Sequence, residues 1–321
     1  MDAFFLVSLK VGIMVIVILV GLVMTKLGKI SENGSKDFTW FLLNIVTPCV
    51  IIDAFANLEA GELSPNLIGL GTFLSVASIL AGAIISPLFF RKQNDSRKKV
   101  LRFATIFSNT GFMGIPLTAA VLGNRGVIFA SIYVAVFNFL IWTLGYAIMS
   151  GDKKVQVKKI FLNPGTIGFV TGLLIYFTGI KLPELITEPI TSLAALNMPV
   201  AMLILGYFIA QIDIKSVIRD IDLYKVSAIR LLLIPSITLL ILVLVKPEFS
   251  LFVSTAIQSC TPAATTTVLF AAITKADAKL ASTSVVATTI FSLITVPLFV
   301  MFAQIIAENI LWLNCDTLHK I

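Results

Sequence analysis

Two apolar segments of the chain are each interrupted near the centre by small polar and helix-breaking residues. They read LRFATIFSNTGFMGIPLTAAVLG and SLFVSTAIQSCTPAATTTVLFAAIT. Proline removes a backbone donor and glycine weakens a helix, so both segments are expected to break, with half-helices restarting near Gly111 and Ala263. Each restarted helix presents free N–H groups and about half of a positive elementary charge at its N-terminus. Together with neutral hydroxyl and amide donors, such ends can hold a carboxylate and still release it.

The predicted anion-binding residues come from these two breaks and from the apolar segment that follows the first. They are Ser108, Asn109, Thr110, Gly111, Ser259, Thr261, Pro262 and Thr265, with Asn138. The residues predicted to break the helices are Gly114, Pro116 and Pro262. A lone proline in an apolar helix is usually only a kink, and an interhelical hydrogen bond explains Asn138 equally well. In these two segments, however, a helix break and a polar cluster occur together at matching positions of the two halves. This coincidence favours a role in binding the substrate.

Asp53 is the only acidic residue well inside an apolar segment, and an ionisable group at such a depth is a functional candidate. Lys10 is predicted at a similar depth. A structural Lys10–Asp53 ion pair is one interpretation, and a proton-coupling or gating role for Asp53 is the other. Arg230 is predicted near the end of its helix, with the guanidinium reaching the membrane interface.

The chain offers little material for catalysis or metal binding. Its only histidine is His319, and its three cysteines lie far apart without a paired spacing. It has no nucleotide-binding or zinc-binding motif. We therefore predict no enzyme activity, no cofactor and no metal site.

The composition places the chain in a lipid bilayer. Its 321 residues are 58% apolar and 13% charged, with a mean hydropathy of +1.00. Soluble chains average about 45–50% apolar and about 25% charged residues, so a soluble enzyme, a disordered protein and a nucleic-acid binder are excluded. The apolar segments predict an all-α polytopic membrane protein with ten spans. They cover roughly 4–25, 38–58, 66–90, 100–122, 126–149, 164–181, 188–210, 224–245, 250–274 and 280–312.

Basic residues define the predicted orientation and the two halves. Alternate loops hold 18 of the 24 lysines and arginines, and the other loops and the tails hold only four. Both termini are therefore expected outside the cytoplasm, in a cytoplasmic cell membrane. Five spans fall in 1–155 and five in 156–321, and an odd number in each half predicts inverted repeats. The patterns LNIVTP, with Asn44 and Pro48, and LNMP, with Asn197 and Pro199, echo each other between the halves.

These motifs resemble a known family. The run from Asn109 to Leu117 resembles the fourth-helix signature of the auxin efflux carrier family, which includes the plant PIN-formed auxin carriers and bacterial malonate and malate permeases. The stretch from Gln258 to Ala271 resembles its second signature more loosely. Ser108 stands where plant carriers have proline, and the short segment 151–163 replaces their long loop. These two departures from the plant carriers favour a small bacterial-type organic anion over auxin as the substrate.

The resemblance implies a fold and a mechanism. Helices 4 and 9 would cross at their breaks, and Asn109 matches an asparagine that contacts the substrate carboxylate. Helices 1, 2, 6 and 7 would form a scaffold, and helices 3–5 and 8–10 a transport domain that moves like an elevator. The predicted function is secondary transport of mono- or dicarboxylates such as malate or malonate, and the alternative is a sodium-coupled carrier of the bile-acid type. The expected partners are the organic anion, the lipid bilayer and a coupling proton or sodium ion, with a homodimer as an open alternative and no nucleic acid.

Overall fold

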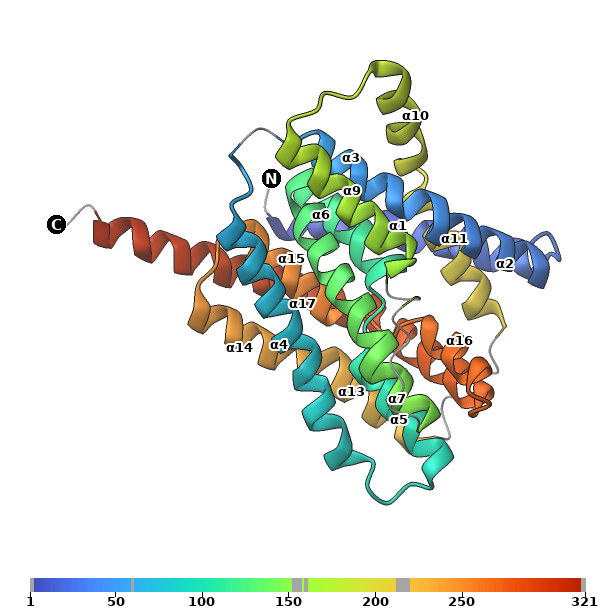
Figure 1. Cartoon of the computed structure of the whole chain (residues 1–321). Coiled ribbons are helices and arrows are strands. Elements are labelled where there is room, and N and C mark those ends of the chain that lie inside the picture. Colours follow the sequence, from blue (N-terminus) through green and yellow to red (C-terminus); the bar gives the residue numbers. More distant parts are fainter. Residues whose placement is uncertain (1–2, 59–60, 152–157, 159–160, 212–219, 319–321) are drawn as a thin grey trace.

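The computed structural model is built of helices, and the part of the chain that it describes contains no β-strand (Figure 1). That part covers residues 3–58, 61–151, 158, 161–211 and 220–318. The helical segments of the first half are α1 (Ala3–Lys26), α2 (Glu32–Phe41), η1 (Leu42–Val46), α3 (Thr47–Ala56), α4 (Pro65–Phe89), α5 (Asp95–Ile106), η2 (Thr110–Gly114), α6 (Ile115–Leu140), η3 (Ile141–Gly145) and α7 (Tyr146–Ser150). Those of the second half are α9 (Pro164–Thr178), α10 (Glu184–Ala194), α11 (Asn197–Ala210), α13 (Ile221–Ala228), η4 (Ile229–Leu233), α14 (Ile234–Val245), α15 (Phe249–Cys260), α16 (Thr266–Ile273) and α17 (Ala278–Leu318). The η segments are π-helical turns within longer helices.

Six helical stretches of the described residues are long and apolar enough to cross a bilayer. They are Glu32–Ala56, Pro65–Phe89, Thr110–Ser150, Glu184–Ala210, Ile221–Val245 and Ala278–Asn309. Three shorter apolar helices accompany them: Gly12–Lys26, Pro164–Thr178 and Phe249–Cys260. The stretch Thr110–Ser150 contains two of the predicted spans. They meet at Gly123, where a φ of 62° interrupts the helix. The number of ten spans therefore remains a prediction, and the predicted boundary at 155/156 lies outside the described residues.

Local sequence signals explain where several helices begin. Ser64, Asn94 and Asn163 precede α4, α5 and α9, and each side chain accepts a hydrogen bond from a backbone N–H of the first turn. Such a cap satisfies one of the amides that a helix start leaves without a partner. Proline follows the cap directly in α4 and α9, where its missing N–H costs nothing.

Two long helix pairs organise one side of the molecule: α1 packs along α11, and α3 packs along α9 (Figure 1). Glycine brings the first pair into backbone contact. A Cβ atom added at Gly21 would lie 2.4 Å from the carbonyl oxygen of Leu203, and one at Gly206 would lie 2.2 Å from that of Ile18. Small residues are the usual device for close helix packing in lipid, where the hydrophobic effect does not drive helices together.

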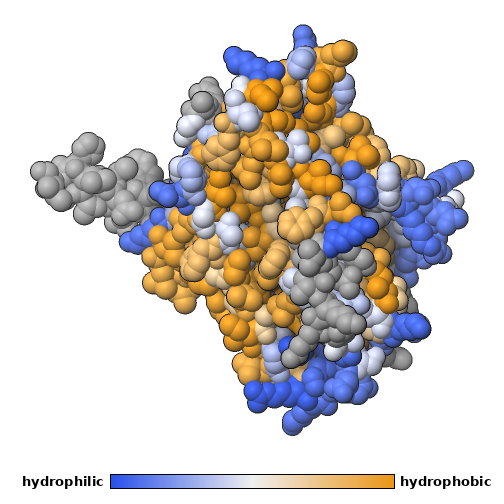
Figure 2. All heavy atoms as spheres, in the orientation of Figure 1, coloured by the Kyte–Doolittle hydropathy of each residue, from blue (hydrophilic) through white to orange (hydrophobic). Residues whose placement is uncertain are grey.

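The surface is apolar across its middle and polar at its ends. Figure 2 shows a broad apolar face with hydrophilic residues gathered at its margins. Large apolar side chains are widely exposed, among them Ile84 at 71%, Leu244 at 74% and Ile294 at 69%. Such a surface is too apolar for water and matches the hydrocarbon core of a membrane.

Candidate functional site

Two helices are broken at the same place in the molecule, and their breaks are bonded to each other. The chain leaves the helix after Ile106 and re-enters it at Thr110, and it leaves again after Cys260 and re-enters at Thr266. Ser108 and Ala263 form an antiparallel bridge between the two breaks. The pairing satisfies backbone groups that lie away from both water and helix, which a protein inside a bilayer requires.

The bridge has two backbone hydrogen bonds. The N–H of Asn109 donates to the carbonyl oxygen of Pro262 at 2.7 Å, and the N–H of Ala264 donates to that of Phe107 at 2.9 Å. Thr261 is extended, with φ −66° and ψ 153°, as the residue before a proline prefers. Pro262 therefore ends α15 and also supplies an acceptor to the other break.

Gly114 lets the two broken helices approach each other. A Cβ atom at this position would lie 2.1 Å from Oε1 of Gln258, which is closer than any real contact. The amide nitrogen of Gln258 donates to the hydroxyl of Thr118 at 3.0 Å, so the Gln258 side chain lies across the glycine. Pro116 lies in the first turn of α6 rather than in the break.

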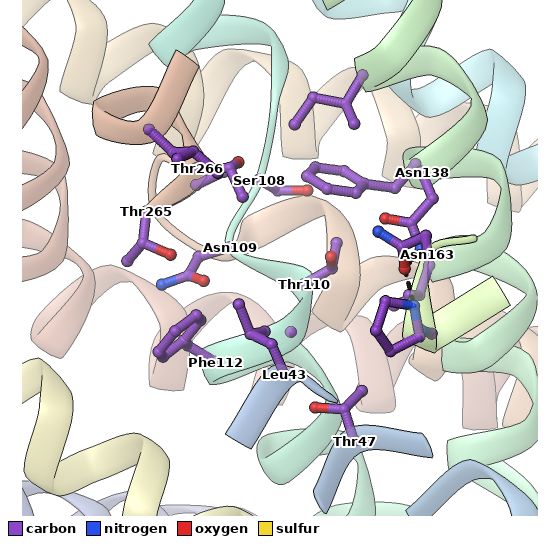
Figure 3. A pocket seen from close by; sticks show the side chains of 18 of the residues that line it. Leu43, Thr47, Ser108, Asn109, Thr110, Phe112, Asn138, Asn163, Thr265 and Thr266 are labelled. Carbon is purple, nitrogen blue, oxygen red and sulfur yellow. Dashed lines mark hydrogen bonds between the residues drawn. The ribbon is translucent and has the colours of Figure 1, made fainter. Parts of the chain in front are cut away.

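A cavity of about 200 Å³ opens beside the bridge (Figure 3). Its polar lining consists of hydroxyl and amide side chains from both breaks and from three neighbouring helices. These residues are Asn44, Thr47, Ser108, Asn109, Thr110, Asn138, Asn163, Thr265 and Thr266. Its apolar wall includes Phe112, Phe137, Trp142, Leu269 and Phe270. None of the lining residues, all within the described part of the chain, carries a charge.

Several donors around this cavity are buried without a protein partner. Nδ2 of Asn109 and the hydroxyls of Thr47 and Thr266 make no hydrogen bond to any described residue. Asn109 is 2% exposed and Thr47 is 4% exposed, so little solvent reaches them. A buried polar group without a partner costs about 1–3 kcal/mol, and these donors are available to hydrogen-bond a molecule in the cavity.

The N-terminal ends of two helices face the same cavity. Asn109 precedes η2 and Thr265 precedes α16, and neither side chain makes the capping bond that such positions usually make. Figure 3 shows both side chains on one side of the cavity, with Asn138 and Asn163 across from them. These two helix starts, which their N-cap side chains leave uncapped, supply positive partial charge to a cavity that no lysine or arginine lines.

Asn138 takes part in a small amide network at the opposite wall. Its Nδ2 donates to Oδ1 of Asn163 at 2.9 Å, and the same oxygen accepts from the N–H of Gly165 at 2.9 Å. Asn138 therefore makes an interhelical hydrogen bond and lines the cavity at the same time. The network connects α6 to the start of α9.

The predicted site residues divide into two groups. The cavity is lined by Ser108, Asn109, Thr110, Gly111, Asn138 and Thr265. Ser259, Thr261 and Pro262 do not line it and instead form the end of α15 and the bridge. Four polar lining residues were not predicted as site residues: Asn44, Thr47, Asn163 and Thr266. Thr266 lies in the second polar cluster, Asn44 and Thr47 lie in the LNIVTP pattern, and Asn163 caps α9. None of these sequence signals by itself points to the cavity.

Neither Asp53 nor Arg230 lines the cavity. The carboxylate of Asp53 accepts hydrogen bonds from the hydroxyl of Thr191 and, at 3.3 Å, from the amide of Asn57. The side chain of Lys10 lies outside the described residues, so the Lys10–Asp53 pair stays a prediction. The prediction for Arg230 is wrong: its side chain does not reach the interface but is 1% exposed and donates to backbone carbonyls beside the bridge.

Comparison with known proteins assigns the family. Residues 6–158 and 153–300 match the model of a family described as membrane transport protein, the auxin efflux carrier-like family. The chain is similar to an uncharacterized transporter of Methanothermobacter thermautotrophicus, with 25% identity over 88% of this chain and 94% of the relative. It is also similar to an uncharacterized transporter of Methanocaldococcus jannaschii, with 23% identity over 89% of this chain and 96% of the relative. The matches confirm the resemblance drawn from the sequence motifs: the chain belongs to the auxin efflux carrier-like membrane transport protein family, a family of transporters and not of enzymes.

Proposed function

We propose that the chain is a secondary transporter for small organic anions, mono- or dicarboxylates such as malate or malonate, in the cytoplasmic membrane. The observation that carries this proposal is the pair of helix N-termini at the cavity, together with the unpartnered amide of Asn109. Carboxylate oxygens accept hydrogen bonds and carry negative charge, so they complement both features. A neutral set of donors binds an anion without the strong ion pair that would hinder its release.

The size of the cavity favours a small substrate. Its volume of about 200 Å³ lies below the range of about 300–1,000 Å³ that is typical of sites for drug-sized ligands. A three- or four-carbon acid suits this space better than an indole-containing acid does. The aromatic wall formed by Phe137, Trp142 and Phe270 would cover the carbon skeleton of the acid.

A second hollow extends from the cavity toward positive charge. It shares Trp142, Asn163 and Pro164 with the cavity and reaches Lys158. Lys158 is exposed and lies between two predicted spans, in a segment that the charge distribution predicts to be cytoplasmic. A cation at the mouth of a path raises the local concentration of anions, so this hollow suits an entrance from the cytoplasmic side.

The packing of the helices supports an elevator-like mechanism with two inverted repeats. In the predicted numbering, α1 with α11 pairs helices 1 and 7, and α3 with α9 pairs helices 2 and 6. An inverted repeat of five helices relates helix 1 to helix 6 and helix 2 to helix 7, so it converts one of these pairs into the other. This symmetry is what we expect of the scaffold. The cavity lies between Thr47 and Gly165 of this scaffold and Asn109 and Thr265 of the breaks. Movement of the breaks along the scaffold would carry a bound anion across the membrane.

The proposal is tested by counterflow in proteoliposomes. Vesicles loaded with unlabelled malate are diluted into labelled malate, and malonate, succinate, lactate and indole-3-acetate compete from outside. We expect saturable accumulation of malate that the small carboxylates inhibit and that indole-3-acetate inhibits poorly. An absence of counterflow for every small carboxylate would contradict the proposal.

A further inference from the structure

A single cation is buried among the backbone of the two breaks. Arg230, in η4, is 1% exposed, and the described part of the chain contains no acidic partner for it. Its Nη1 donates to the carbonyl oxygens of Thr105 at 3.2 Å and Ile106 at 2.9 Å. Its Nη2 donates to the carbonyl oxygen of Ser259. A buried arginine without a carboxylate is costly unless other groups compensate its charge.

The three carbonyls are among those that the breaks deprive of their helical partners. In a continuous helix the carbonyl of Thr105 would accept from the N–H of Asn109, and that of Ile106 from the N–H of Thr110. Here Asn109 donates to Pro262 at 2.7 Å and Thr110 donates to Ser108 at 2.9 Å.

The same holds for the second break. The carbonyl of Ser259 would accept from the N–H of Ala263, but that N–H donates to the hydroxyl of Thr288 at 3.1 Å. Arg230 therefore replaces the missing N–H donor of two carbonyls at the end of α5 and of one carbonyl at the end of α15.

The charges also balance. Each helix C-terminus carries about half of a negative elementary charge, so the ends of α5 and α15 together carry about one, which a single guanidinium neutralises. The four helix ends at the crossing are thus divided in function. The two N-terminal ends face the cavity, and Arg230 holds the two C-terminal ends.

Resting on the proposed function, we propose that Arg230 is a positioning residue that acts as a tethered cation. It neutralises and fixes the two carbonyl ends and so keeps Asn109 and Thr265 in place for the anion. Carbonyls at the C-terminal ends of broken helices are the groups with which transporters of related design bind sodium. With Arg230 on these carbonyls, wild-type binding of the anion needs no sodium ion at the crossing.

The test removes the Arg230 guanidinium by substitution and then supplies methylguanidinium in solution. Arg230→Ala, Arg230→Met and Arg230→Lys are compared with the wild type and with Arg91→Met, which removes an exposed arginine. Thermal unfolding is followed in sodium, in choline and with low concentrations of methylguanidinium, below those that unfold the wild type. We expect methylguanidinium to raise the unfolding temperature of Arg230→Ala and to leave Arg91→Met unchanged or slightly lowered. Equal responses of these two variants would overturn the proposal.

Malate counterflow provides the second measurement. Arg230→Met is expected to lose about tenfold in apparent malate affinity, which is within the usual range of coupling between two sites. Arg230→Lys retains the charge and should lose clearly less, although lysine lacks the planar fork that serves both ends. Equal losses in the two variants, or sodium-dependent wild-type counterflow, would overturn the proposal.

The two experiments separate this inference from the proposed function. If the wild type carries no malate, the proposed substrate class fails, and the methylguanidinium response still decides the role of Arg230. If Arg230→Ala does not fold, the unfolding temperatures of Arg230→Lys and Arg230→Met decide it. A lysine variant no more stable than the methionine variant contradicts a need for positive charge at this position.

Discussion

Asn109 and Pro262 join two distant parts of the chain: the backbone N–H of Asn109 donates to the carbonyl oxygen of Pro262 at 2.7 Å. Because this bond uses only backbone atoms, it leaves the Asn109 amide free, and Nδ2 remains without a partner at the cavity. The break thus supplies both the backbone connection and the unpartnered donor. Transport proteins use broken helices in this way because an unbroken helix satisfies all of its own backbone groups.

Gly114 should be intolerant of any side chain. Gly114→Ala places a Cβ atom 2.1 Å from Oε1 of Gln258, and overpacking of this kind costs about 1–3 kcal/mol. The expected result is a lower unfolding temperature in detergent. Gln258→Ala in the same chain removes the clashing atom and should recover part of the loss. A double variant no more stable than Gly114→Ala would contradict the contact.

Substitutions of Asn163 can test the effect of a negative charge at the cavity wall separately from the loss of the α9 cap. Asn163→Asp and Asn163→Ser both retain an oxygen that can cap α9, but only the aspartate adds a negative charge to the cavity wall. We therefore expect both variants to remain close to wild type in unfolding temperature. Malate affinity should fall by about tenfold or more in the aspartate variant, because the added negative charge repels the anion. A tenfold loss corresponds to only about 1.4 kcal/mol of binding free energy. Equal malate affinities would show that the cavity does not bind an anion.

Asp53 is expected to have a structural role. Its hydrogen bonds to Thr191 and Asn57 lie outside the cavity, and Asp53→Asn retains an acceptor oxygen while removing the charge. With the predicted Lys10 partner, Asp53→Asn alone should lower expression or transport, because it leaves a cation unpaired. Lys10→Met with Asp53→Asn should restore both. Restored expression without transport would assign Asp53 a role in coupling or gating.

Arg97 connects the start of α5 to the start of α13. It pairs with Asp220, and its Nε donates to Asp222 at 2.9 Å. Burial lowers the pKa of Arg97, but the hydrogen bonds and charges of the two carboxylates raise it by more, so its pKa is raised overall. The guanidinium stays charged throughout the neutral range, and its contribution to stability should not change there with pH.

The Arg97 contact should depend on the shape of the side chain. Arg97→Lys is expected to lose about 1–2 kcal/mol of stability, between the value of an exposed salt bridge and that of a buried charged hydrogen bond. Chemical denaturation of wild type, Arg97→Lys and the exposed control Arg91→Lys measures the difference. Equal stability of all three would show that the two-carboxylate contact is unimportant.

The sequence predicts the broken helices well because their causes are local. Proline and glycine act on the backbone at their own positions, so the expected restarts near Gly111 and Ala263 lie close to the observed starts at Thr110 and Thr266. Asn109 and Thr265 could be selected for the same reason, since donors that precede a helix start must lie at its N-terminus. The identity of the family also follows from these local motifs.

Apart from Asn138, the polar residues that reach the cavity from other helices were not predicted as site residues. Asn163 and Thr47 come to the cavity through the packing of α9 and α3, and a single sequence contains no record of that packing. Arg230 was misassigned because depth along a helix does not say which face of the helix is buried. Counting residues suggested an interface, whereas the three carbonyls without partners, which become visible only in three dimensions, explain its burial.

The proposal on which the others depend is that an organic anion binds at the two helix starts through Asn109. It is tested most directly by solid-supported membrane electrophysiology, which compares wild type, Asn109→Ala and the exposed control Asn66→Ala over a series of malate concentrations. We expect a saturable current in the wild type and in Asn66→Ala, and a loss of at least about tenfold in apparent malate affinity in Asn109→Ala. Asn109→Ala with wild-type affinity and current would contradict it.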